Sequence, residues 1–127
     1  MDNLLNRNSY KILIVEDEES NFELLKALLR NFRFEIIWAK NGIDAVELCN
    51  RYPFDLVLMD IKMPEMNGYE AVEKIRKKGI NVPIIAQTAY ARIEDESIIL
   101  NKGFDGYISK PIDKNKLIEL VKKSLNI

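Results

Sequence analysis

The chain of 127 residues contains no histidine and only one cysteine, Cys49. Without histidine it cannot form a serine–histidine triad or a histidine-based metal site, and Cys49 has no histidine to activate it as a nucleophile. A single cysteine also excludes an internal disulfide and favours a reducing compartment. We therefore interpret Cys49 as a packing residue of a helix.

The chain also lacks a strong net charge and a long apolar run. Its formal net charge of -1 gives no reason to expect nucleic acid or anionic lipid as a direct partner. No stretch approaches the ~20 apolar residues that a membrane span needs, and the polar segment 1–9 has no signal-peptide character. We expect a cytoplasmic domain without membrane contact, with the cytosolic part of a membrane-bound protein as the alternative.

Length and composition suit one domain. A chain of 127 residues that is 47% hydrophobic can bury a core of its own. No internal repeat, linker or low-complexity tract divides it. We expect a flexible N-terminal segment at residues 1–9 and a single domain at residues 10–127.

Strand and helix patterns alternate five times along this domain. Continuous apolar runs predict buried strands at residues 12–15, 34–39, 56–59, 82–86 and 104–109. Apolar residues that recur at three and four predict a helix after each strand. The apolar stripes of four of these helices lie at residues 22–32, 43–48, 71–75 and 117–121, and the fourth helix along the chain is predicted at residues 93–101. The alternation predicts an α/β fold, in which a parallel sheet is covered by helices on both faces through right-handed crossovers.

Polar side chains stand at or just beyond the ends of four of these predicted strands. In an open parallel sheet the carboxyl ends of the strands lie along one edge, where ligand sites form. Acids, a hydroxyl and an ammonium would therefore converge, a grouping that suits a divalent metal beside a carboxylate that becomes phosphorylated. The residues are Glu16, Asp17, Asp60, Thr88, Tyr107, Lys110 and Pro111.

The acids of this set match the ligands that magnesium prefers. Mg²⁺ takes hard oxygen ligands in a near-octahedral shell and keeps several waters. Asp17 and Asp60 can each offer a carboxylate oxygen, and the main-chain carbonyl of Lys62 can offer a third. Glu16 is suited to hold a metal-bound water. Without metal, the packed acids repel one another.

The most suitable nucleophile in the set is Asp60. A carboxylate can accept a phosphoryl group and form an acyl phosphate. Such a transfer depends mainly on positioning and charge neutralisation. Lys110 can neutralise phosphoryl charge as a point charge, and Thr88 can donate a hydrogen bond to a phosphoryl oxygen.

Each of these residues has a simpler interpretation when it is taken alone. An acidic pair after a strand often only begins a helix, because carboxylates suit helix N-termini. Thr88 could be a turn residue, Lys110 a surface charge and Tyr107 a core aromatic of a strand. The joint pattern, at one end of successive strands, favours the functional interpretation.

The sequence resembles the receiver domains of response regulators in two-component signalling, from about Lys11 to the end of the chain. The resemblance implies a flavodoxin-like (βα)5 doubly wound sandwich with five parallel strands in the order 2-1-3-4-5. The segments that carry it are Ile14 to Glu18, Leu58 to Pro64, Asn67-Gly68, Thr88-Ala89 and Tyr107 to Pro111.

The resemblance also implies a role for each site residue. Glu16 and Asp17 would be the acidic pair that binds Mg²⁺ or Mn²⁺, and Asp60 would be the phosphoacceptor. Thr88 and Tyr107 would be the switch residues. Lys110 would bind the phosphate, with its peptide bond to Pro111 in the cis form, and Lys62 and Tyr90 would tune dephosphorylation. A long charged side chain at Lys62 and an aromatic ring at Tyr90 could obstruct attacking water, so the resemblance predicts slow hydrolysis of the acyl phosphate.

The same resemblance implies the partners. The phosphoryl group would come from a phosphohistidine of a histidine kinase or a histidine phosphotransfer domain, and Asn21 and Phe22 near the site mouth could dock it. Several segments are most similar to receivers of hybrid sensor histidine kinases. We expect an excised domain of such a kinase, with a stand-alone receiver as the alternative.

The expected output is a change of surface and not catalysis on a substrate. Phosphorylation would draw Thr88 toward the phosphoryl group and let Tyr107 turn inward. A face that includes Ile98, Ile99 and Leu117 would then bind an unknown downstream partner. Phosphorylation-dependent dimerisation is possible in this family.

Three other functions remain open at this point. A hydrolase that turns over an aspartyl phosphate usually carries a second Asp two residues after the nucleophile, where this chain has Lys62. A flavodoxin-like module that binds a flavin phosphate needs a hydroxyl- or glycine-rich first loop, and the acidic loop at residues 16–19 would repel a phosphate. A purely structural docking module has no use for convergent charges.

Overall fold

The structure, a computed structural model, describes residues 9–89 and 93–127. The segment 1–9, which we expected to be flexible, lies outside these ranges except for Ser9. The described strands are β1 (Tyr10–Val15), β2 (Phe34–Ala39), β3 (Leu56–Asp60), β4 (Ile84–Thr88) and β5 (Gly106–Ser109). The helices between and after them are α1 (Glu19–Leu28), α2 (Gly42–Arg51), α3 (Gly68–Lys77), α4 (Ile93–Asn101) and α5 (Lys114–Leu125).

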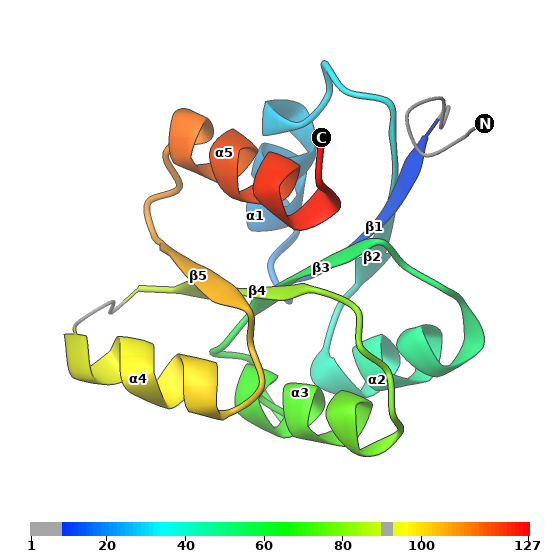
Figure 1. Cartoon of the computed structure of the whole chain (residues 1–127), viewed down its shortest axis with the longest axis vertical. Helices are drawn as coiled ribbons and strands as arrows, with labels where there is room; N and C mark the ends of the chain where they lie inside the picture. The colour runs from blue at the N-terminus through cyan, green and yellow to red at the C-terminus, as the bar shows by residue number, and fades with distance from the viewer. Residues whose placement is uncertain (1–8, 90–92) are drawn as a thin grey trace.

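The five strands form one parallel sheet in the order β2-β1-β3-β4-β5. Helices α1 and α5 cover one face, and α2, α3 and α4 cover the other (Figure 1). The predicted α/β class, the strand order and the two helical layers are therefore confirmed. None of the helices in the described ranges has the length and apolar character that crossing a bilayer requires.

Each face of the sheet has its own apolar cluster. On one face, Leu25 of α1 and Leu117 of α5 pack against inner-strand residues. On the other, Val72 and Ile75 of α3 are completely buried. The continuous apolar run of β1 has this origin, because every residue from Ile12 to Val15 faces one helical layer or the other.

Helix α2 differs from its predicted apolar stripe. Its buried residues are the small ones, Gly42, Ala45 and Cys49, whereas Ile43 is exposed. The helix approaches the β3–α3 loop so closely that a Cβ on Gly42 would lie 2.6 Å from the carbonyl oxygen of Met66. Cys49 is a buried packing residue as predicted, and burial raises the pKa of its thiol to about 11.

Several predicted boundaries differ from the observed ones by a few residues. Helix α1 ends at Leu28 and not at residue 32, and β5 begins at Gly106 and not at residue 104. Strand β4 begins at Ile84, because Pro83 has no N–H and the carbonyl of Val82 accepts a hydrogen bond from Arg76. It continues to Thr88, since Gln87 and Thr88 still pair with β5.

Candidate functional site

The carboxyl ends of β1 and β3 bring three acids together. Glu16 and Asp17 directly follow β1, and Asp60 is the last residue of β3. One carboxylate oxygen from each acid lies within 4.8 Å of the others. Glu16 and Asp60 are buried and Asp17 is exposed. Asp17 and Asp60 line a surface pocket.

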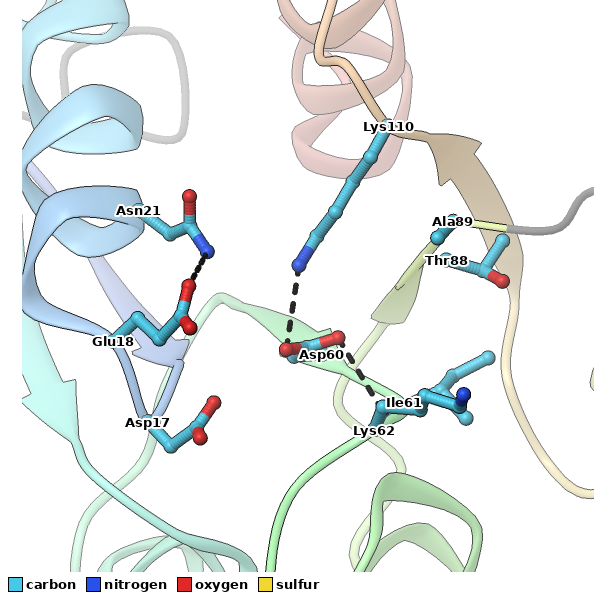
Figure 2. Close-up of a pocket in the computed structure, with 9 residues that line it drawn as sticks. All are labelled: Asp17, Glu18, Asn21, Asp60, Ile61, Lys62, Thr88, Ala89 and Lys110. Atoms are coloured by element: carbon cyan, nitrogen blue, oxygen red, sulfur yellow. Dashed lines mark hydrogen bonds and ion pairs between the residues drawn. The ribbon is translucent and has the colours of Figure 1, made fainter.

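Lys110, which follows the edge strand β5, places its positive charge beside the three acids. Its Nζ lies 3.3 Å from Asp60 Oδ2 (Figure 2). The same Nζ lies 3.6 Å from Glu16 Oε2. The Lys110-Pro111 peptide bond is cis, as the resemblance implied. The main-chain N–H of Lys110 also donates to the carbonyl of Thr88 at 2.8 Å.

Asp17, Asp60 and Lys110 line an open pocket with a volume of about 360 Å³. Figure 2 shows residues that come from β1, α1, β3, β4 and β5 or the loops that follow them. The lining residues are Asp17, Glu18, Asn21, Asp60, Ile61, Lys62, Thr88, Ala89 and Lys110. Solvent reaches the pocket, so a partner or a small phosphodonor has access to Asp60.

The acidic cluster has the properties of a divalent cation site. Three carboxylates gather beside the Lys110 ammonium, and within residues 9–89 and 93–127 the buried Glu16 Oε2 has no hydrogen-bond partner. A buried carboxylate oxygen without a hydrogen-bond donor lowers the stability of the folded protein unless a positive charge neutralises it. Because all the side-chain donor atoms are carboxylate oxygens, they match Mg²⁺ or Mn²⁺ better than a softer metal.

The electrostatic cost of the cluster is visible in Glu16. Burial, followed by the negative charge of Asp60, raises the pKa of Glu16 from 4.5 to about 7. The ammonium of Lys110 and hydrogen bonds from the Glu18 N–H and the Asn21 amide oppose this rise. The native protein therefore holds a proton on Glu16 at mildly acid pH that the unfolded chain releases.

We expect the metal-free protein to be more stable at about pH 5 than at about pH 8. A raised pKa means that the native state binds more protons than the unfolded state between 4.5 and about 7. The Glu16 contribution to stability is therefore full below pH 4.5 and is lost as the pH rises through about 7. The loss should reach a few kcal/mol, measured by urea unfolding in a chelator.

Two controls identify the source of this pH dependence. Glu16→Gln should flatten the dependence between the two pH values, and Mg²⁺ should restore stability at the higher pH because it binds only the native cluster. A pH dependence that survives in Glu16→Gln would assign it to other groups.

The predicted switch residues lie on the neighbouring strands β4 and β5. Thr88 at the end of β4 is buried, and its hydroxyl is directed away from Asp60 in Figure 2. Tyr107 in β5 is half-buried and packs against the cluster beneath α2, α3 and α4. Lys62 is exposed at the pocket, and its main-chain N–H lies 3.3 Å from Asp60 Oδ1. Tyr90 lies outside the described residues.

The structure corrects one predicted docking residue. Phe22 is buried and stacks on Trp38, with ring centroids 4.5 Å apart, so it is not available to a partner. Asn21, the other predicted docking residue, lines the pocket. On the predicted output face, Ile98 is exposed, whereas Ile99 and Leu117 belong to the core.

Two residues, Asn21 and Trp38, support the acidic cluster in a way that the sequence did not predict. The Asn21 amide donates to Glu18 at 2.8 Å and to Glu16 at 3.4 Å, which orients the acidic loop. The indole N–H of Trp38 donates to the main-chain carbonyl of Glu16 at 2.8 Å. The sequence offers a weak signal for Trp38, namely that a large polar-tipped aromatic stands near the end of a strand that pairs with β1.

Comparison with known proteins identifies the family of this site. Residues 12–122 match the family described as the response regulator receiver domain. The chain belongs to this family. The receiver is 38% identical over 116 residues to the polar-differentiation response regulator DivK of Brucella anthropi, covering 90% of this chain and 94% of DivK.

The receiver is also similar to parts of larger sensor kinases. It is 34% identical over 124 residues to the sensor histidine kinase GacS of Pseudomonas protegens, and the match spans 94% of this chain but only 14% of GacS. The receiver domain of the sensor histidine kinase PA1611 from Pseudomonas aeruginosa superimposes with a TM-score of 0.85 at 33% identity, covering 94% of this chain and 99% of that one. That crystal structure has a magnesium ion coordinated in its active site cleft.

Proposed function

We propose that this receiver takes a phosphoryl group onto Asp60 from a phosphohistidine of a histidine kinase or a histidine phosphotransfer domain. The observation that carries the proposal is the position of the Asp60 carboxylate. It lies at the floor of an open pocket, 3.3 Å from the Lys110 ammonium and clustered with Glu16 and Asp17. A phosphorylated donor can approach from solvent, since the pocket is open.

The proposed acceptor step is a displacement at phosphorus. A carboxylate oxygen of Asp60 forms a bond to phosphorus as the bond to the donor's imidazole nitrogen breaks, and the imidazole leaves with the electron pair. Mg²⁺, when bound, would neutralise charge on the phosphoryl oxygens. We assign its coordination to Asp17, Asp60 and the main-chain carbonyl of Lys62, with Glu16 holding a metal-bound water. The magnesium ion in the related PA1611 receiver supports this assignment.

Lys110 and Thr88 would then stabilise the acyl phosphate. Lys110 now pairs with the Asp60 carboxylate, and a phosphoryl group on that carboxylate would place an anionic oxygen within reach of the same ammonium. The Thr88 hydroxyl has to turn toward Asp60 to donate to another phosphoryl oxygen. This movement would let Tyr107 turn inward and change the surface near α4 and β5, where the exposed Ile98 lies. Two further points stay predictions. Lys62 and Tyr90 are predicted to slow hydrolysis of the acyl phosphate, and phosphorylation is predicted to promote dimerisation.

Intact-mass measurement after incubation with Mg²⁺ and acetyl phosphate tests the proposal. We expect a stable gain of one phosphoryl group, and no gain when a chelator removes the metal. Rapid consumption of acetyl phosphate without a stable adduct would instead favour an aspartyl-phosphate hydrolase. No adduct and no consumption would contradict the proposal and favour a flavin-binding or docking module.

A further inference from the structure

The main chain of Glu16 is held from both sides by the end of β2. The N–H of Glu16 donates to the carbonyl of Ala39 at 3.0 Å, which extends the β1–β2 pairing by one bond. Its carbonyl accepts from the indole N–H of Trp38 at 2.8 Å. Glu16 is completely buried, so a main-chain carbonyl at this position has little access to water as an alternative partner.

The indole itself has a fixed position. Trp38 lies within β2, opposite Ile14 in the pairing register with β1. Its ring stacks on Phe22 of α1 with centroids 4.5 Å apart and planes 5° from parallel. Lys40 Nζ lies 5.0 Å from the Trp38 ring centroid. Contacts from a strand, a helix and a cation therefore limit the rotation of the ring, and its N–H keeps one direction.

We propose that Trp38 is a positioning residue for the cation site and acts through the Glu16–Asp17 peptide. This inference rests on the proposed function, because it assumes that the acidic cluster binds Mg²⁺. The carbonyl that accepts from Trp38 belongs to the same planar peptide unit as the nitrogen of Asp17. Fixing that carbonyl therefore fixes the direction in which the chain leaves β1 and the place of the Asp17 carboxylate.

The exposure of Asp17 makes this support necessary. Asp17 is exposed, and it follows the last residue that the sheet holds, whereas Asp60 is still within β3 and is buried. Mg²⁺ demands near-ideal octahedral geometry, so a displaced carboxylate binds it poorly. Groups that orient metal ligands without touching the metal typically change metal affinity by 10–100-fold.

The test is the Mg²⁺ affinity of Trp38→Phe, measured by isothermal titration calorimetry on folded protein. Phenylalanine keeps a ring against Phe22 but has no N–H. We expect Mg²⁺ to bind about tenfold more weakly than to the wild type. Phosphorylation by acetyl phosphate should then need about tenfold more Mg²⁺ for half-maximal rate, with a maximal rate close to that of the wild type.

Phe22→Leu is the matched control. It replaces the ring stacked on Trp38 with a smaller apolar side chain, while the β1–β2 register and the indole N–H that donates to the Glu16 carbonyl are retained. Its melting temperature should fall while its Mg²⁺ affinity stays within about twofold of the wild type. A merely structural role for Trp38 would lower the melting temperature of both variants and leave both Mg²⁺ affinities unchanged.

A second substitution keeps the test decisive if Trp38→Phe fails to fold. Because the chain has one tryptophan, growth with benzothienylalanine changes position 38 alone and replaces the indole N–H by sulfur at nearly constant shape. Unchanged Mg²⁺ affinity in the folded protein that lacks the N–H overturns the inference alone. A wild type that does not bind Mg²⁺ overturns both the inference and the metal assignment of the proposed function.

Discussion

Replacing Asp60 with asparagine is expected to abolish phosphorylation of the receiver by acetyl phosphate. Asparagine keeps the size of the side chain but offers an amide in place of the nucleophilic carboxylate, so no acyl phosphate can form there. It also removes the second largest cause of the raised pKa of Glu16, the charge of Asp60. Intact-mass measurement should detect no phosphoryl adduct under conditions that label the wild type fully.

The control for this variant is Glu18→Gln. Glu18 lines the same pocket and accepts a hydrogen bond from Asn21, but it lies outside the three-acid cluster. We expect Glu18→Gln to retain phosphorylation of Asp60. An undiminished adduct in Asp60→Asn would place the phosphoacceptor elsewhere, and peptide mapping after reduction of the acyl phosphate would locate it.

The largest expected loss of stability comes from Arg76→Met. The Arg76 guanidinium donates to the carbonyls of Ile80, Val82 and Gly103 at 2.8–3.0 Å and pairs with the Asp105 carboxylate at 2.8 Å. One side chain of α3 thus fixes the start of β4 and the loop before β5. Methionine fills similar space but leaves these carbonyls without their donor.

We expect this variant to lose about 3 kcal/mol of unfolding free energy, since each of the three part-buried carbonyls that loses its donor costs about 1 kcal/mol and solvent screens part of the ion pair. The melting temperature should fall by roughly 10 °C, measured by calorimetry. Lys77→Met on the same helix is the control, because Lys77 is exposed and its ion pair with the exposed Glu73 is long, at 3.8 Å. Equal losses in the two variants would show that the Arg76 network adds nothing specific.

The fold was predictable from the sequence where one physical cause dominates. Burial on both faces produces the apolar runs of β1 and β3, and these strands were located almost to the residue. The start of β4 was not predictable, because it depends on a hydrogen bond from Arg76 to Val82. The buried face of α2 was also missed, since close approach to the β3–α3 loop selects small residues over large apolar ones.

In the candidate site, the grouping of the charged residues was predictable from the sequence, whereas the contacts that orient them were not. The convergence of Glu16, Asp17, Asp60 and Lys110 follows from parallel strand order, and the predicted grouping agrees with the observed distances. The contacts that orient the cluster, from Trp38 to a carbonyl and from Asn21 to two carboxylates, depend on side-chain directions that residue spacing does not encode. Phe22 was wrongly predicted to face a partner, because residue spacing does not show that its side chain turns inward to stack on Trp38.

The hydrogen bond from the Lys110 N–H to the Thr88 carbonyl limits how far the backbones of β4 and β5 can move apart when the pocket changes. It joins the residue that ends β4 to the residue that follows β5, directly beside the proposed phosphoacceptor. The two backbones cannot separate there without breaking this bond. If this bond is kept on phosphorylation, we expect a change at Asp60 to reach the distant face mainly by rotation of side chains, with the pairing of β4 and β5 retained.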